Sequence, residues 1–161
     1  MAHSVGTKSP LVIAHRGASY KAPENTLAAY NLAWKLNSDA IEIDIRKTKD
    51  GFLVCSHDNN LNRISSNRKS ISSMLLSELT EVDVGSWKSK EYKNERMPLL
   101  SKVLSTIPKG KKVFIEIKGA LKEIDELISI VKKSKLKIKD CHFLSYICLL
   151  YTSPSPRDGC R

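Results

Sequence analysis

The stretch "DAIEIDIRKT", residues 39–48, alternates apolar and charged side chains along most of its length. Because successive side chains of a β-strand point to opposite faces, the three isoleucines share one face, and Glu42, Asp44 and Arg46 share the other. Two carboxylates about 7 Å apart at Cα can converge on one cation, and their mutual repulsion favours a bound Mg²⁺ or Ca²⁺. The alternative interpretation is an edge strand whose polar face meets water.

Three other predicted strands also end in ionisable side chains. They are residues 11–14, followed by His15 and Arg16; residues 52–58, which end in His57 and Asp58; and residues 111–119, in which Glu116 and Lys118 lie opposite Ile115 and Ile117. In a parallel sheet the carboxyl ends of the strands gather on one side, where ligands bind. The pattern therefore predicts a single mouth lined by carboxylates, imidazoles and cations.

Helical segments alternate with these strands. The spacing of apolar side chains predicts helices over residues 26–36, 75–79, 99–105 and 121–133, and a fifth strand over residues 140–146. The buried stripes are expected to be Leu27, Tyr30, Ala33 and Trp34 in the first helix, and Leu121, Ile124, Leu127, Ile128 and Val131 in the last. Residues 59–73 and 84–98 are expected to be loops. Repeated strand–helix units predict an α/β fold with a mainly parallel sheet covered by helices.

The residue types at this mouth favour metal-assisted phosphodiester hydrolysis. Carboxylates bind hard cations, histidines act as general acid and base near neutral pH, and Arg and Lys bind phosphate oxygens. The chain contains no GxxxxGK[ST] loop for a nucleoside triphosphate. Simpler interpretations remain for single residues: a histidine at a strand end can be structural, Lys118 can cap a strand, and Asp58 either orients His57 or starts a turn.

Bulk composition limits the other functional classes. The chain has 161 residues, 41% of them hydrophobic, and a formal net charge of +10. The excess is mostly scattered lysine with few aromatic residues between, so we expect no nucleic-acid partner, whereas an anionic substrate or peripheral contact with an anionic membrane fits the charge. We expect no transmembrane segment and no secretory signal. The four cysteines lack CxxC spacing, which favours reduced thiols and a cytoplasmic location.

Taken together, the ordered motifs resemble those of the glycerophosphodiester phosphodiesterase family. The matching stretches are "AHRG" (14–17), "APENT" (22–26), "IEIDIRKTKDGFLVCSHD" (41–58), "LNRIS" (61–65), "ERMPLLSKVL" (95–104) and "VFIEIKG" (113–119). The resemblance covers about residues 11–145. It implies a (β/α)₈ barrel of the TIM type that hydrolyses small glycerophosphodiesters to an alcohol and glycerol 3-phosphate with a divalent cation.

The resemblance also implies roles for individual residues. Glu42, Asp44 and Glu116 would hold the metal, and His15 and His57 would be the acid–base pair. The remaining roles fall to Arg16 and Lys118, which would bind the phosphate, and to Glu24 and Asn25, which would support the mouth. Which histidine is the acid, which alcohol leaves and which oligomer forms stay open.

The chain is shorter than the resemblance requires. A complete (β/α)₈ barrel takes about 250 residues, so we expect only about the first half, with an incomplete parallel sheet. The expected organisation is an N-terminal extension (1–10), a partial phosphodiesterase domain (11–145) and a tail that is disordered or derived from non-coding sequence (146–161). The alternatives to glycerophosphodiester hydrolysis are a related activity on lysophospholipids and a non-catalytic fragment that binds a phosphate ligand.

Overall fold

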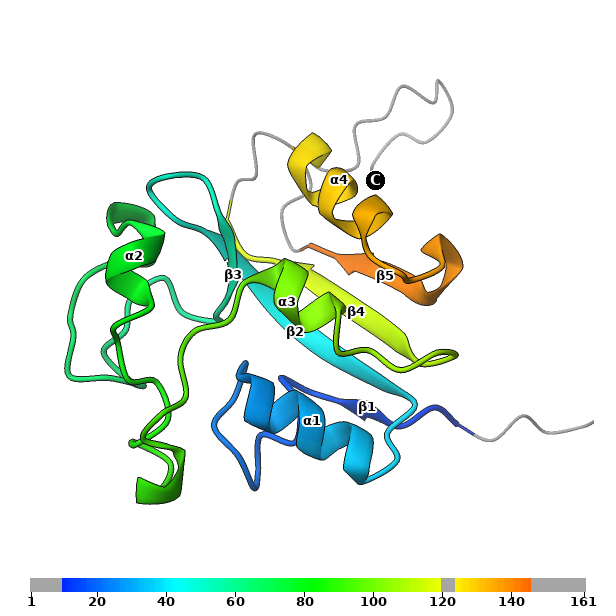
Figure 1. Ribbon diagram of the computed structural model, residues 1–161, viewed down its shortest axis with the longest axis horizontal. Coiled ribbons are helices and arrows are strands. Elements are labelled where there is room, and N and C mark those ends of the chain that lie inside the picture. Colours follow the sequence, from blue (N-terminus) through cyan, green and yellow to red (C-terminus); the bar gives the residue numbers. More distant parts are fainter. Residues whose placement is uncertain (1–9, 120–123, 146–161) are drawn as a thin grey trace, which may run out of the picture.

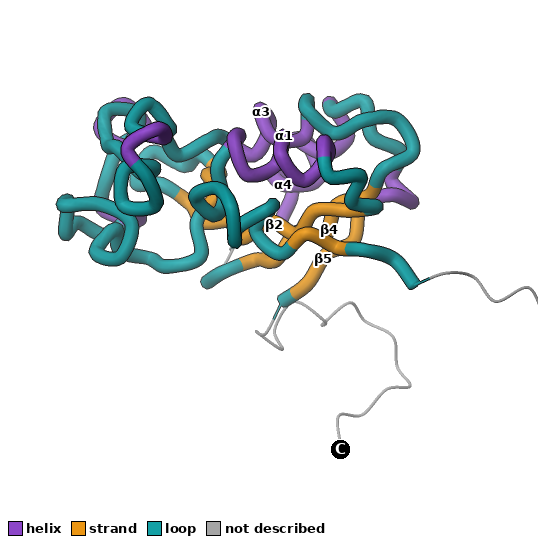
Figure 2. The backbone as a smooth tube through the Cα atoms, turned by 90° about the horizontal axis from the view of Figure 1, so that it is seen from below, coloured by secondary structure: helices purple, strands orange, loops and turns teal. Residues whose placement is uncertain are grey.

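The described chain folds into a five-stranded sheet with helices against one of its sides (Figures 1 and 2). A computed structural model describes residues 10–119 and 124–145. In chain order the elements are β1 (Ile13–Ala14), α1 (Leu27–Lys35), β2 (Ala40–Lys47), β3 (Leu53–Cys55), η1 (Ile71–Ser73), α2 (Leu76–Leu79), η2 (Lys90–Tyr92), α3 (Leu100–Leu104), β4 (Lys112–Ile117), α4 (Ile124–Lys133), η3 (Ile138–Asp140) and β5 (Cys141–Leu144).

Four of the strands are parallel and lie in the order β1-β2-β4-β5. In the register between β2 and β4, Ile43 lies beside Ile115 and Asp44 lies beside Glu116. The chain passes from β1 to β2 through α1, from β2 to β4 through β3, the segment after it and α3, and from β4 to β5 through α4. These connections keep the four strands parallel, as in one half of a (β/α)₈ barrel. The predicted α/β class is confirmed.

The isoleucine face of β2 lies in the core, as the alternation predicts. Ile41, Ile43 and Ile45 are buried with side chains of α1, α3 and α4, and Figure 2 shows these helices on one side of the strands. The N-terminus of α1 is capped by Thr26, whose hydroxyl oxygen accepts a hydrogen bond from the Ala29 N–H at 3.2 Å. β2 is a central strand, so the edge-strand interpretation is wrong.

Strand β3 runs in the opposite direction from the expectation. It pairs antiparallel with β2, with Cys55 opposite Ile45 and Leu53 opposite Lys47. The chain passes beyond the carboxyl end of β2, turns, and comes back, so His57 reaches the mouth on the return arm of a hairpin. Side chains alternate between the two faces of a sheet in the same way in parallel and antiparallel strands, so the sequence pattern could not reveal the direction of β3.

The segment between β3 and α3 contains a second hydrophobic cluster. Residues 59–73 are mainly irregular, as expected for a loop, and end in η1. Three of their apolar side chains, Leu61, Ile64 and Ile71, are buried in this cluster. The buried members of the cluster are Val54, Leu61, Ile64, Ile71, Met74, Leu79, Val84 and Met97. Figure 1 shows this insertion on the left, beside the carboxyl ends of the strands.

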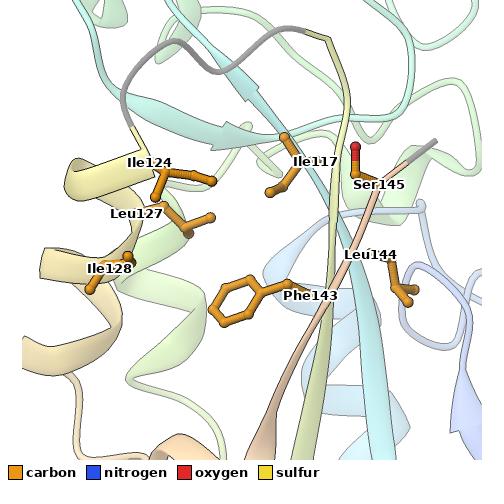
Figure 3. Close-up of a pocket in the computed structure, with 7 residues that line it drawn as sticks. All are labelled: Ile117, Ile124, Leu127, Ile128, Phe143, Leu144 and Ser145. Atoms are coloured by element: carbon orange, nitrogen blue, oxygen red, sulfur yellow. The ribbon is translucent and has the colours of Figure 1, made fainter. Parts of the chain in front are cut away.

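Helix α4 covers the sheet with only part of its apolar stripe. Leu127 and Val131 are buried, whereas Ile124 and Ile128 remain partly exposed and line an apolar groove of about 210 Å³ with Phe143 of β5. Figure 3 shows this groove open between the helix and the strand. Leu121, which is predicted to belong to the buried stripe, lies outside the described residues. Most of the predicted N-terminal extension and the predicted tail lie outside them as well.

Among the described residues, no helix has the length and apolar character needed to cross a membrane. Both cysteines in this part of the chain, Cys55 and Cys141, are free thiols.

Candidate active site

Three buried carboxylates converge at the mouth of the sheet. Glu42, Asp44 and Glu116 each offer one oxygen, and these oxygens lie within 4.8 Å of one another. The register sets this convergence, because Asp44 and Glu116 are neighbours across β2 and β4 and Glu42 precedes Asp44 by two residues on the same face. The sequence-predicted ligand set is therefore brought together.

The carboxylate cluster is suited to a hard divalent cation. Glu42 Oε1 is buried and has no hydrogen-bond partner among the described residues. Burial, and then the negative charge of Asp44, raise the pKa of Glu42 to about 7. A divalent cation would relieve both effects, since it supplies positive charge and accepts the free carboxylate oxygens as ligands. The donor set thus fits Mg²⁺ or Ca²⁺.

The two predicted phosphate-binding cations lie against these carboxylates. Arg16 Nε is 3.2 Å from Asp44 Oδ2, and Lys118 Nζ lies 3.3 Å from Asp44 Oδ1 and 2.6 Å from Glu116 Oε1. Burial alone would lower the pKa of Lys118, but its hydrogen bond with Glu116 and the charge of Asp44 raise it. Lys118 is therefore held as a cation inside the mouth, which is more than a strand cap requires.

The loop after β1 is folded tightly against helix α1. Arg16 and Asn25 have positive φ angles of 56° and 55°, and Gly17 has a φ of 80°. A Cβ atom on Gly17 would come within 2.7 Å of the backbone carbon of Ala29, so only glycine fits there. A non-glycine residue with a left-handed backbone conformation destabilises the fold by about 1 kcal/mol or more, and such residues concentrate at functional sites. The "HRG" and "EN" sequences thus set the backbone path of the mouth.

Asn25 fixes the position of Asp44 through a chain of hydrogen bonds. Its amide nitrogen donates to Asp44 Oδ2 at 2.9 Å, and its amide oxygen accepts from the Asp44 N–H at 3.3 Å. The same oxygen accepts the Tyr30 hydroxyl at 2.7 Å. Burial raises the pKa of Tyr30, so its hydroxyl remains a donor. A residue expected only in the core of α1 therefore also orients the site.

His15 lies at the exposed rim of the mouth. Its side chain is 66% exposed, and its Nε2 atom is 3.8 Å from Glu42 Oε2. The neighbouring Arg16 N–H donates to the same carboxylate oxygen at 3.0 Å. Since Ala14 pairs with Ile41, the register of β1 on β2 brings His15 next to Glu42.

His57 is held from both its ring and its backbone. Its Nδ1 is 2.7 Å from Asp58 Oδ1, and its carbonyl oxygen accepts hydrogen bonds from Arg46 at 2.8 and 2.6 Å. Burial raises the pKa of Asp58, but hydrogen bonds from His57 and Arg63 outweigh it and hold that pKa below its usual value. Asp58 is thus an ionised acceptor that orients the imidazole, the first of the two roles considered for it.

Arg63 joins the insertion to the mouth. Its guanidinium binds Glu24 at 2.7 and 2.8 Å and Asp58 at 2.9 Å, and Glu24 also binds Arg16 at 3.1 Å. Burial raises the pKa of Glu24, but Arg63 and Arg16 together lower it below its usual value. Arg63 was not among the predicted site residues. The "LNRIS" match was the only signal in the sequence, because nothing local indicates a partner 39 positions away.

Comparison with known proteins gives a consistent result. The model of the "Glycerophosphoryl diester phosphodiesterase family" matches residues 15–146. A glycerophosphodiester phosphodiesterase of Caldanaerobacter subterraneus is 40% identical over 114 residues, which are 69% of this chain and 46% of that protein. The chain spans about half the length of the curated relatives it matches.

Solved structures agree in fold. A phosphodiesterase from Oleispira antarctica, in complex with the product sn-glycerol-3-phosphate, has a TM-score of 0.81 and 34% identity, covering 86% of this chain and 58% of that one. A glycerophosphodiester phosphodiesterase from Agrobacterium tumefaciens has a TM-score of 0.80 and 31% identity, covering 86% and 59%. The described chain is therefore part of a TIM-type barrel.

Proposed function

The chain belongs to the glycerophosphoryl diester phosphodiesterase family, and from that premise we propose that the protein hydrolyses glycerophosphodiesters to an alcohol and glycerol 3-phosphate. The main support is the convergence of Glu42, Asp44 and Glu116 beside two side-chain cations at the mouth. The structure of the Oleispira antarctica phosphodiesterase in complex with the product sn-glycerol-3-phosphate supports the substrate class.

In this proposal the three carboxylates hold one Mg²⁺ or Ca²⁺ ion. A divalent cation in such a site polarises a phosphoryl oxygen and lowers the pKa of a bound hydroxyl. Arg16 and Lys118 exchange part of their contact with Asp44 and Glu116 for the non-bridging phosphate oxygens. Their charges then stabilise the negative charge that develops on the phosphoryl group.

His15 and His57 move the protons. One imidazole takes a proton from the attacking hydroxyl, which belongs either to the glycerol of the substrate or to water. The new P–O bond forms as the bond to the leaving alcohol breaks, and the other imidazole donates a proton to that alcohol. If water attacks, the product is glycerol 3-phosphate. If the glycerol hydroxyl attacks, the product is a cyclic phosphate, and water then opens it to glycerol 3-phosphate with the two imidazoles in exchanged roles. The Asp58 carboxylate beside Nδ1 favours a proton on that nitrogen of His57, which leaves Nε2 for the reaction.

The extent and location of the domain are part of the proposal. We assign the phosphodiesterase domain to residues 11–145 and the segment 146–161 to a tail outside it, in line with the match over residues 15–146. A cytoplasmic location agrees with the free thiols of Cys55 and Cys141.

An assay for glycerol 3-phosphate release from glycerophosphocholine tests the reaction. We expect release that stops on addition of a chelator, returns with Mg²⁺ or Ca²⁺, and falls by a factor of at least 100 in His57→Ala. The control variant Lys102→Ala changes an exposed lysine outside the mouth and leaves the rate unchanged. Release that persists in chelator, or in the double variant Glu42→Gln/Asp44→Asn, would refute the mechanism.

Two other candidate functions give different results in the same experiment. A relative from Homo sapiens named lysophospholipase D GDPD1 is 33% identical over 136 residues, so a lysophospholipid is the second substrate to assay. A non-catalytic fragment that binds a phosphate ligand would release no product. In that case Glu42→Ala would weaken binding of glycerol 3-phosphate, but there would be no turnover to lose.

A further inference from the structure

Two loops at the far end of the sheet from the carboxylates form one lysine-lined hollow. The loop between α3 and β4 supplies Lys109 and Lys111, and the loop between α4 and β5 supplies Lys135, Lys137 and Lys139. The hollow has a volume of about 550 Å³. Figure 1 shows the two loops at the right, where the arrows of β4 and β5 start, whereas the mouth lies at the opposite ends of these strands. We call this surface the lysine hollow.

The charges of the lysine hollow are not offset within the described protein. Its single acidic lining residue, Asp140, is 3.4 Å from the ammonium group of Lys112. Lys111 donates a hydrogen bond to the neutral amide of Asn37 at 3.2 Å. Among residues 10–119 and 124–145, none of the five lysines forms an ion pair with a carboxylate. Five like charges around one concavity create a strong positive potential that attracts an anionic partner.

The lining chemistry indicates which kind of anionic partner. The described lining residues include no arginine for bidentate phosphate binding and no aromatic ring on which a nucleic-acid base could stack. Ile138 is not one of the lining residues, but it lies between Lys137 and Lys139 in the sequence and is 63% exposed. A group of lysines next to an exposed apolar residue is a combination that binds anionic lipid surfaces.

We propose that the lysine hollow docks the protein on an anionic membrane surface, with Ile138 entering the interface. Docking through this end of the sheet leaves the mouth facing water, because the carboxylates lie at the carboxyl ends of the same strands. This orientation favours water-soluble glycerophosphodiesters over lysophospholipids held in the same bilayer, an inference about substrates that rests on the proposed function.

Vesicle co-sedimentation of the full chain tests the docking surface. The probes are vesicles of phosphatidylcholine alone and vesicles with about 30% phosphatidylserine, at about 0.1 M salt. We expect binding only to the anionic vesicles. In the variant Lys109→Gln/Lys135→Gln/Lys137→Gln, the partition coefficient should fall roughly 100-fold, and Ile138→Ser should lower it several-fold.

The matched control removes three exposed lysines on the mouth side, in Lys21→Gln/Lys90→Gln/Lys93→Gln. It has the same net charge as the test variant, and thermal melting verifies that both fold. An equal loss of binding in the control would overturn the proposal, because net charge alone would then explain binding. Absence of phosphatidylserine-dependent binding, or preferential binding of RNA, would overturn it as well.

Hydrolysis separates this proposal from the proposed function. The variant Lys109→Gln/Lys135→Gln/Lys137→Gln should release glycerol 3-phosphate from soluble glycerophosphocholine at the wild-type rate. Vesicle binding without hydrolysis would contradict the proposed function alone, and hydrolysis without vesicle binding would contradict the docking surface alone.

Discussion

At the scale of single residues, Asp44 shows how the mouth is preorganised. Its side chain is fully buried, yet one oxygen contacts Lys118 while the other contacts both Arg16 and the Asn25 amide. Because the Asp44 carboxylate only accepts and the Asp44 N–H only donates, the Asn25 amide nitrogen faces the carboxylate, and the Tyr30 hydroxyl donates to the amide oxygen and holds it there.

Tyr30→Phe tests this orientation without altering the packing volume greatly. We expect a loss of about 1 kcal/mol in the free energy of unfolding and a smaller rise in melting temperature on addition of Ca²⁺, because Asp44 is less firmly held. Tyr92→Phe removes a part-exposed hydroxyl, 3.3 Å from the Lys21 carbonyl, and is the control. A Ca²⁺ response in Tyr30→Phe equal to that of Tyr92→Phe would show that the hydroxyl does not act on the site.

Glu42→Gln is expected to stabilise the chain in the absence of a cation. Burial and the charge of Asp44 raise the pKa of Glu42 to about 7, so at pH 8 its ionised form is unfavourable in the folded state. We expect the variant to unfold at a higher temperature than the wild type in chelator at pH 8, with a free energy of unfolding that is higher by about 1 kcal/mol or more. With Mg²⁺ or Ca²⁺ the order should reverse. A lower melting temperature in chelator would contradict the role of Glu42 as a strained ligand.

At the scale of structural elements, the insertion between β3 and α3 is joined to the mouth by Arg63. The insertion has its own hydrophobic cluster. The Arg63 guanidinium contacts Glu24 and Asp58 and so connects the insertion to the loops after β1 and β3. The hairpin formed by β2 and β3 and the insertion therefore position His57 together.

Arg63→Met should lower stability in a pH-dependent way. Because Arg63 helps hold the pKa values of Glu24 and Asp58 below their usual range, its contribution is present above about pH 4.5 and is lost as pH falls through the lower pKa values of the folded state. We expect a loss of about 1–2 kcal/mol at pH 7 and a much smaller one at pH 3, measured by urea unfolding. Equal losses at both pH values would mean that packing of the side chain, and not its charge, matters.

For each element, the sequence predicted the features that the periodic spacing of apolar and charged side chains encodes. The alternation in residues 40–47 correctly separated Ile41 and Ile43 from Glu42 and Asp44, because the pleat of a strand leaves no other arrangement. The direction of β3 and the partner of Arg63 were not predictable in this way, since periodicity is blind to strand direction and to pairs distant in sequence. Tyr30 was placed correctly in the core, but its hydroxyl partner depends on the folded loop.

At the scale of the whole molecule, the sheet separates two kinds of charge. The carboxylates lie at the carboxyl ends of the strands, and the lysine hollow lies at the opposite end. The apolar groove beside α4 and the open order β1-β2-β4-β5 match about half of a barrel. All seven residues expected to act directly in the reaction lie in this half, so cation binding can be measured on this chain.

Calorimetric titration of Ca²⁺ or Mg²⁺ into the chelator-treated chain is the most direct test of a shared cation site. We predict saturable binding of one ion per chain in the wild type, lost in each of Glu42→Gln, Asp44→Asn and Glu116→Gln while their melting curves remain cooperative. Binding that survives all three substitutions, or no binding by a folded wild-type chain, would contradict the account.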